Sequence, residues 1–235
     1  MIEDDRIRRI IDPGTTHKLL RGKRGELMNS ESGVQRFAMI RQFCLADWFT
    51  LGNAISGTAA MFSTITYVQT GASMHLYFAA ALVAAALVFD ILDGRIARWR
   101  HTQSPLGREL DSLADVISFG VAPALMGYAC GMQDLYDRIV LGYFVACGVS
   151  RLARYNVTAE ELSAGTAKVK YFEGTPIPTS VAVVLMLTVA VYLGAIGEQL
   201  WWGERRLFGY LVHPLVLVYG ASGTLMISRI KIPKL

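Results

Sequence analysis

Four aspartates are the residues of this sequence best placed to do chemistry. Asp90 and Asp93 directly follow an uncharged run at 76–89, and Asp111 and Asp115 directly precede another uncharged run. If both runs cross a membrane, the chain leaves it beside the first pair and re-enters it beside the second, so all four carboxylates lie at one end. Ionisable groups at membrane depth are costly and face protein or water, which makes this cluster a candidate functional site.

Helical spacing also places the four carboxylates on shared faces. Positions i, i+3, i+4, i+7 and i+8 form one stripe of a helix, which here holds Asp90, Asp93, Gly94, Ala97 and Arg98. A second stripe at i, i+4 and i+8 holds Gly107, Asp111 and Asp115. Gly94 and Ala97 are small, so a ligand can approach the helix backbone there.

Converging carboxylates repel one another unless a cation lies between them. Hard divalent ions such as Mg²⁺ prefer oxygen ligands and commonly bridge to the phosphates of a substrate. Two such ions would clamp a diphosphate and stabilise charge on a departing phosphate. The alternative is a structural ion-pair cluster in which Arg95, Arg98 and Arg108 neutralise the acids. Spacing alone leaves both interpretations open.

The segments that must position these residues are long and uncharged. Of the 235 residues, 53% are hydrophobic and 18% are charged, whereas ordinary soluble domains carry about 25% charged residues. A helix needs about 20 apolar residues to cross a hydrocarbon core. We therefore predict six transmembrane helices, at 48–68, 71–89, 116–133, 139–149 extended at both ends, 175–197 and 207–228.

The predicted fold is an all-α integral membrane domain at 33–235, preceded by a flexible basic cytosolic tail at 1–32. A juxtamembrane amphipathic helix is predicted at about 34–46, because apolar residues recur there at helical spacing and are flanked by arginines that suit an anionic membrane surface. Its apolar residues are Val34, Phe37, Ile40, Phe43 and Cys44. A soluble capping helix is the alternative for this segment.

The distribution of Lys and Arg predicts the orientation. Basic residues gather at both termini and in the second and fourth connections, whereas the first connection has no charge. The positive-inside rule therefore places both termini and the aspartates on the cytosolic side. The formal net charge of +4 is too small to indicate nucleic-acid binding, and Cys44, Cys130 and Cys147 lack the spacing of a zinc site.

The acidic pattern resembles the signature of the CDP-alcohol phosphatidyltransferase family. The sequence Asp90-x2-Asp93-Gly94-x2-Ala97-Arg98-x8-Gly107-x3-Asp111-x3-Asp115 matches that signature at every defined position. The resemblance implies a six-helix bundle, a homodimer, and a site for two Mg²⁺ or Mn²⁺ ions that opens to the cytosol. It also implies that the four aspartates hold the ions and that Asp115 is in addition the general base for the acceptor hydroxyl.

The same resemblance implies how CDP-diacylglycerol binds. Its diphosphate would lie along the small and acidic positions of the signature, and Arg98, a planar bidentate donor, suits a phosphate. An Asn early in the first span lies beside the nucleotide in this family, which implies that role for Asn53; the alternative is a structural hydrogen bond from Asn53 to a neighbouring helix. The implied contacts to CDP-diacylglycerol are therefore Asn53, Asp93, Gly94, Ala97, Arg98, Gly107 and Asp111.

Two further segments bear on the acceptor alcohol. The segments 151–156 and 171–178, together with 111–123, are similar to those of CDP-diacylglycerol–serine O-phosphatidyltransferases. The stretches 37–64 and 170–176 resemble particularly the fungal members. This likeness implies an enzyme of the endoplasmic reticulum that uses L-serine and membrane-embedded CDP-diacylglycerol and releases CMP. A pocket for serine needs basic and acidic or aromatic groups, and we assign it to Arg151, Arg154, Tyr155 and Glu173. The alternative for the two arginines is that they only anchor the helix end on the cytosolic side.

Other functions remain open from the sequence. The acceptor could be inositol or glycerol 3-phosphate within the same family, because the signature does not name it. An intramembrane prenyltransferase also binds a diphosphate through aspartates, but it carries two separated Asp-rich motifs. A cation transporter needs a polar path across the bilayer, whereas the acids here gather at one end.

Overall fold

The computed structural model describes residues 44–100, 105–163, 171–203, 205–207, 210–228 and 231–233. These residues belong to one compact unit, Cys44–Leu235. The predicted tail at 1–32 and the predicted juxtamembrane helix up to residue 43 lie outside the described residues. Both therefore stay predictions, as does the division into domains.

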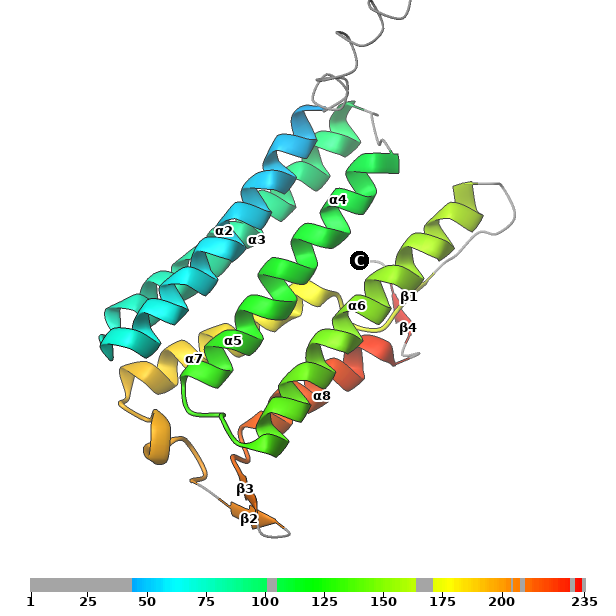
Figure 1. The fold of residues 1–235 in the computed structure, drawn as a ribbon. Helices are drawn as coiled ribbons and strands as arrows, with labels where there is room; N and C mark the ends of the chain where they lie inside the picture. The colour runs from blue at the N-terminus through cyan, green and yellow to red at the C-terminus, as the bar shows by residue number, and fades with distance from the viewer. Residues whose placement is uncertain are drawn as a thin grey trace, which may run out of the picture. The chain divides into compact units, whose positions relative to one another are not determined.

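Helices make up most of the described chain, which confirms the predicted helical class. The helices α2 (Leu45–Thr70) and α3 (Met74–Arg100) form an antiparallel pair joined by a short turn at Gly71. Gly71 ends α2 in the left-handed conformation, with φ of 71°, which glycine adopts without steric cost. Figure 1 shows this pair side by side along its whole length.

The next helical rod changes its winding at the acidic residues. It consists of α4 (Pro105–Asp115), the π-helix η3 (Val116–Val121) and α5 (Ala122–Ala129), which follow one another without a break. Single π turns inside α-helices are rare and are frequently found at functional sites. Here the π segment begins directly after the last of the four aspartates.

The remaining helices complete the bundle. Helix α6 (Leu135–Ser163) packs against α8 (Val216–Ile227), and α7 (Val181–Tyr192) continues the short 3₁₀ helix η4 (Ile177–Ser180). Another 3₁₀ turn, η5 (Gly197–Gln199), follows α7. With 29 residues, α6 is much longer than its uncharged segment 139–149, because the charged residues at its two ends are helical too.

Two short antiparallel ladders add to the predicted helices. Strand β1 (Tyr171–Glu173) pairs with β4 (Lys231–Pro233), and β2 (Arg205–Leu207) pairs with β3 (Tyr210–Val212). The prediction of a helix from residue 207 was therefore wrong at residues 207 and 210–215. Pro214 disfavours the helical conformation for the residue before it, and the helix begins only at Val216.

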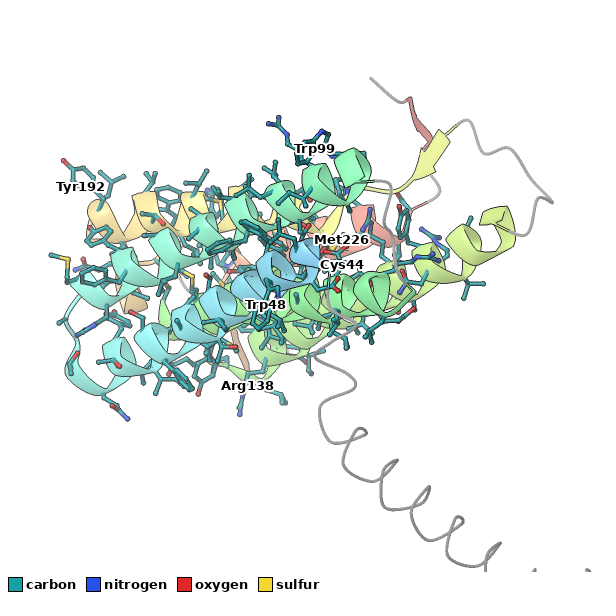
Figure 2. All side chains as sticks on the ribbon, turned by 90° about the horizontal axis from the view of Figure 1, so that it is seen from above. Cys44, Trp48, Trp99, Arg138, Tyr192 and Met226 are labelled. Atoms are coloured by element: carbon teal, nitrogen blue, oxygen red, sulfur yellow. The ribbon has the colours of Figure 1, made fainter. Side chains whose placement is uncertain are left out.

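The outer surface of the bundle is compatible with a membrane protein. The segments Met74–Trp99 and Leu106–Ala129 combine the length and apolar composition of a membrane-crossing helix, while Ile177–Tyr192 and Val216–Ile227 are apolar but shorter. Large apolar side chains face outward on α2 and α3, among them Ile55, Phe62, Val68, Phe78, Val88 and Ile91. Figure 2 shows the exposed Trp99 and Tyr192 at opposite ends of the helices.

Helix α2 turns a partly polar face toward the interior. The buried residues of that face are Ala46, Asp47, Thr50, Asn53, Ser56, Gly57, Ala60 and Thr64. Gly57 lies directly against Ser118 of η3, and a Cβ atom added at Gly57 would lie only 2.7 Å from the Cα of Ser118. This close approach brings the polar face of α2 onto the rod that carries Asp111 and Asp115.

Candidate active site

Three of the predicted carboxylates meet at the end of the bundle where α3 ends and α4 begins, which we call the acidic end. Asp90 and Asp93 come from α3 and Asp111 comes from α4. Each offers an oxygen atom, and these atoms all lie within 4.8 Å of one another. Asp93 is buried, and the other two are half-buried. The convergence expected from membrane topology is thus present in the structure.

Asp115 lies one helical turn beyond Asp111 and is buried. Its carboxylate is outside the group of three within 4.8 Å, although it lies close enough to interact electrostatically with Asp90, Asp93 and Asp111. Asn53 Nδ2 of α2 donates a hydrogen bond of 3.2 Å to Asp115 Oδ1. Asp115 is therefore adjacent to the other three carboxylates and held from a different side.

Neutral donors on α2 reach both acidic helices. Thr50 Oγ1 donates to Asp93 Oδ2 at 2.8 Å, and Asn53 donates to Asp115. The main-chain oxygen of Asn53 in turn accepts a hydrogen bond of 2.9 Å from Ser118 Oγ. Hydrogen bonds from neutral donors orient carboxylates but leave their negative charge in place.

The acidic end fits a hard divalent cation. Asp111 Oδ1 is buried and accepts no hydrogen bond. Within the described part of the chain, no ion pair joins Arg95, Arg98 or Arg108 to the four carboxylates, so the ion-pair alternative lacks support. Buried charges are otherwise paired or coordinate metals, and carboxylate oxygens are the ligands that Mg²⁺ and Mn²⁺ prefer.

Apart from Asn53 of α2, the residues assigned to CDP-diacylglycerol lie on α3 and α4. Gly94 and Ala97 are half-buried on α3, and Gly107 is half-buried on α4. Arg98 is exposed, and its guanidinium lies 3.5 Å from the position that a Cβ atom would occupy at Gly94. Arg98, the basic residue on the same helix stripe as Asp90 and Asp93, thus lies beside Gly94, where the sequence predicts that a ligand approaches.

The residues assigned to serine lie on α6 and β1. Arg151 is half-buried, lies within electrostatic reach of Asp115, and has a buried Nε atom without a hydrogen-bond partner. Arg154 is half-buried and Tyr155 is exposed on the same helix. Glu173 belongs to β1, but its side chain lies outside the described part of the structure.

The sequence analysis missed Thr50 and the π-helix. A sequence signal for Thr50 does exist, because Asp47, Thr50, Asn53 and Gly57 recur at helical spacing around the start of a predicted span that carries no charge. A polar stripe in such a span faces protein or water rather than lipid. The π-helix has no comparable signal, since its residues are ordinary apolar and small ones.

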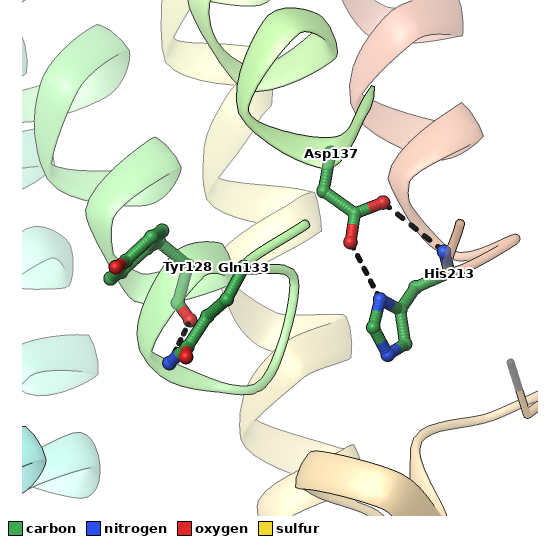
Figure 3. A network of polar contacts seen from close by, with 4 residues as sticks. All are labelled: Tyr128, Gln133, Asp137 and His213. Atoms are coloured by element: carbon green, nitrogen blue, oxygen red, sulfur yellow. Dashed lines mark hydrogen bonds and ion pairs between the residues drawn. The ribbon is translucent and has the colours of Figure 1, made fainter. Parts of the chain in front are cut away.

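A second group of potential metal ligands lies at the opposite end of the bundle, where α5 ends and α6 begins. It consists of Asp134, Asp137 and His213, whose ligand atoms also lie within 4.8 Å of one another. Figure 3 shows that both oxygens of the buried Asp137 face His213. The main-chain N–H of His213 donates to Oδ1 at 3.1 Å, and His213 Nδ1 lies 2.6 Å from Oδ2. Asp137 therefore ties the start of α6 to the segment before α8.

Comparison with known proteins identifies the family. The family model described as CDP-alcohol phosphatidyltransferase matches residues 43–219, which include all four aspartates of the acidic end. The chain belongs to the CDP-alcohol phosphatidyltransferase family. Members of this family generally use a divalent metal, which agrees with the geometry of the acidic end.

Curated relatives of this phosphatidyltransferase chain are named CDP-diacylglycerol–serine O-phosphatidyltransferase. The protein of Saccharomyces cerevisiae is 41% identical over 213 residues, which cover 89% of this chain and 77% of the relative. The Helicobacter pylori protein is 36% identical over 194 residues, covering 81% of this chain and 72% of the relative. The Mycobacterium leprae protein is 36% identical over 159 residues, which are 67% of this chain but only 49% of that longer relative.

Proposed function

We propose that this chain is a CDP-diacylglycerol–serine O-phosphatidyltransferase. It transfers the phosphatidyl group of CDP-diacylglycerol to the hydroxyl of L-serine and releases CMP. The observation that carries this proposal is the 41% identity to the yeast enzyme of that name, which extends over 89% of the chain. Family membership and the convergence of carboxylates at the acidic end support the same reaction class.

In the proposed reaction the serine hydroxyl oxygen attacks the phosphorus that carries diacylglycerol. A new phosphorus–oxygen bond forms to serine, and the bond from that phosphorus to the CMP oxygen breaks. Asp115 is the general base that accepts the hydroxyl proton, a role that requires hydrogen-bond reach of the substrate. The hydrogen bond from Asn53 holds Asp115 in place, and Arg98 binds phosphate through its planar guanidinium.

Asp90, Asp93, Asp111 and Asp115 are the proposed ligands of two Mg²⁺ or Mn²⁺ ions. Bound divalent ions would polarise the diphosphate and stabilise the charge on departing CMP. Three of these carboxylates offer oxygens within 4.8 Å of one another, and Asp111 keeps a buried oxygen without a donor, which supports the assignment. Asn53, Gly94, Ala97, Arg98 and Gly107 are proposed to contact CDP-diacylglycerol together with Asp93 and Asp111.

Serine is proposed to bind between the acidic end and α6. Arg151 and Arg154 would bind its carboxylate, because a guanidinium matches a carboxylate through two parallel hydrogen bonds. Tyr155 and Glu173 would face its ammonium group. The nearness of Arg151 to the charge of Asp115 supports this placement, since the acceptor must present its hydroxyl to the general base.

We also propose how the chain is disposed in its membrane. Helices α2, α3, α4–η3–α5, α6, η4–α7 and α8 would form the six spans of a domain at 33–235, following the basic tail at 1–32. Trp and Tyr concentrate at membrane interfaces, and the exposed Trp99 and Tyr192 at opposite ends of the bundle suit the two interfaces. The proposed setting is the endoplasmic reticulum, as a homodimer with its acidic end and both termini in the cytosol.

An acceptor screen tests the proposed function. The purified full-length protein is mixed with CDP-diacylglycerol, Mn²⁺ and one acceptor at a time from serine, inositol, glycerol 3-phosphate, choline and ethanolamine. We expect CMP release and a phospholipid product with serine and only background with the others. Product with a different acceptor would keep the family chemistry but refute serine as the substrate.

A further inference from the structure

We propose that Thr50 is a positioning residue that holds the Asp93 carboxylate for the divalent ion at the acidic end. The inference deepens the proposed function and rests on it only in that Asp93 is taken as a metal ligand. Its basis is the buried hydrogen bond of 2.8 Å from Thr50 Oγ1 to Asp93 Oδ2, which joins α2 to α3.

Thr50 differs from the other threonines of its helix. The hydroxyls of Thr58, Thr64, Thr66 and Thr70 each donate to the main-chain oxygen four residues earlier, at 2.8–2.9 Å. This is the ordinary local bond of a Thr in a helix. The corresponding distance from Thr50 Oγ1 to Ala46 O is 3.3 Å, longer than its distance to Asp93. The Thr50 hydroxyl is thus directed at another helix.

The location of this hydrogen bond gives it a role beyond packing. Thr50 and Asp93 are both buried, 4% and 6% exposed, so water does not compete for the carboxylate there. A carboxylate that is anchored through one oxygen cannot rotate freely, and its lone pairs stay directed toward the ion. Hydrogen-bond partners of metal ligands orient those ligands and typically change metal affinity by about 10- to 100-fold when they are removed.

Helix α2 thereby sets the distance between ligands from two different helices. Thr50 anchors Asp93 of α3, and one turn further along α2 Asn53 anchors Asp115 of α4. No hydrogen bond from α2 reaches Asp90 or Asp111 in the described part of the chain. We therefore assign α2 the role of a template that fixes one ligand from each acidic helix and leaves the other two to adjust to the ion.

The test measures Mn²⁺ binding directly, by the loss of the electron paramagnetic resonance signal of free Mn²⁺ during titration of the purified full-length protein in detergent. Thr50→Val keeps the shape of the side chain but removes the donor, and we expect its Mn²⁺ affinity to fall by about 10- to 100-fold. Thr50→Ser keeps the donor and should retain the wild-type affinity. Asp93→Asn provides the reference for a lost ligand.

Thr64→Val is the matched control. Thr64 lies on the same helix, is equally buried, and donates only to its own helix at Ala60 O. If Thr64→Val weakens Mn²⁺ binding as much as Thr50→Val does, the effect comes from α2 stability and the inference is wrong. Should Thr50→Val not fold, Thr50→Ala is compared with Thr64→Ala in the same assay.

The design separates this inference from the proposed function. A wild-type protein that binds Mn²⁺ but makes no phosphatidylserine refutes the serine assignment and leaves the role of Thr50 intact if Thr50→Val binds Mn²⁺ more weakly. A wild-type protein that makes phosphatidylserine, together with a Thr50→Val variant that binds Mn²⁺ normally, refutes the role of Thr50 alone.

Discussion

The two ends of the bundle each gather three potential metal ligands, yet their hydrogen bonding differs. At the opposite end, both oxygens of Asp137 are engaged by His213, through the main chain and through the imidazole. At the acidic end, donors on α2 engage Asp93 and Asp115, while Asp111 keeps a buried oxygen without any partner. Convergence of ligand atoms is therefore common to both ends and does not by itself distinguish a reactive site.

The hydrogen-bond partners of the carboxylates indicate that the opposite end is a structural link and that the acidic end is a site for a ligand. A buried carboxylate whose oxygens are both satisfied stabilises the contact it makes and has little to gain from an ion. A group of carboxylates that receives only neutral donors and keeps an unpaired oxygen lacks a compensating positive charge, which a cation can supply. We expect substitutions at the acidic end to affect catalysis, and substitutions at the opposite end to affect stability.

The largest expected effect is the loss of activity on changing a proposed ligand. Asp90→Asn, Asp93→Asn and Asp111→Asn each remove a charged oxygen ligand, and losing several kcal/mol of stabilisation from a metal ion lowers the rate by about 1,000-fold. CMP release measures the effect, and thermal unfolding should show that the variants remain folded. The same change at the opposite end, Asp134→Asn, should leave activity in place. Full turnover by any two ligand variants at saturating Mn²⁺ would contradict the assignment.

His213→Ala is expected to have a smaller effect, which falls on stability and not on activity. The change removes the imidazole partner of the buried Asp137, and a hydrogen bond to a charged group contributes about 1.5–3 kcal/mol. We expect a lower unfolding temperature in detergent with nearly normal activity per folded molecule. His75→Ala is the control, because the hydrogen bond between His75 and Ser63 uses the main-chain oxygen of His75 and not its imidazole. Unchanged stability of His213→Ala would remove the contrast between the two ends.

Arg154→Lys tests whether the arginines of α6 bind the carboxylate of serine beside the acidic end. Lysine keeps the charge but loses the bidentate geometry, and the loss of one charged hydrogen bond of about 1.5–3 kcal/mol raises the KM for serine by roughly 10- to 100-fold. The KM for CDP-diacylglycerol should change little. Arg138→Lys, at the exposed start of α6, is the matched control. A selective rise in the KM for CDP-diacylglycerol would mean that these arginines bind lipid phosphate.

The smallest expected effect concerns the spacing between α2 and the rod that carries Asp115. A Cβ atom at Gly57 would collide with Ser118, so Gly57→Ala should destabilise the protein by about 1–3 kcal/mol through overpacking. Gly142→Ala, in an open part of α6, meets no atom within 4 Å and should gain up to about 1 kcal/mol of helix stability. Thermal unfolding of both variants measures the difference. Equal stability of Gly57→Ala and Gly142→Ala would show that the contact between α2 and η3 shifts to accommodate the added methyl group.

Gly57→Ala has a second expected consequence, because Ser118 also donates to the main-chain oxygen of Asn53. Any shift of Ser118 moves Asn53, which holds the proposed general base. We therefore expect CMP release per folded molecule to fall in Gly57→Ala and to stay normal in Gly142→Ala. Normal activity in both variants would limit the role of this contact to stability.

The sequence by itself determined the reaction class and most of the helices. The spacing of the four aspartates follows from chemistry, because ligands for one site must recur on one face of a helix at i, i+3 or i+4. The long uncharged runs identified the helices, since crossing a membrane demands about 20 apolar residues in a row. Both signals are local in the chain, which is why they could be read without a structure. The hairpin at β2 and β3 was missed because its second strand, Tyr210–Val212, is as uncharged as the residues of a span.

Only the tertiary structure decided which polar residues are partners. Asp137 and His213 are 76 residues apart, and Thr50 and Asp93 are 43 residues apart, so no periodicity along the chain connects them. Their contacts depend on how far helices slide and rotate against one another, and close approaches such as that of Gly57 to Ser118 set this arrangement. The sequence thus predicted that the carboxylates gather, whereas the packing of α2 decided which of them are held and which carry an oxygen without a partner.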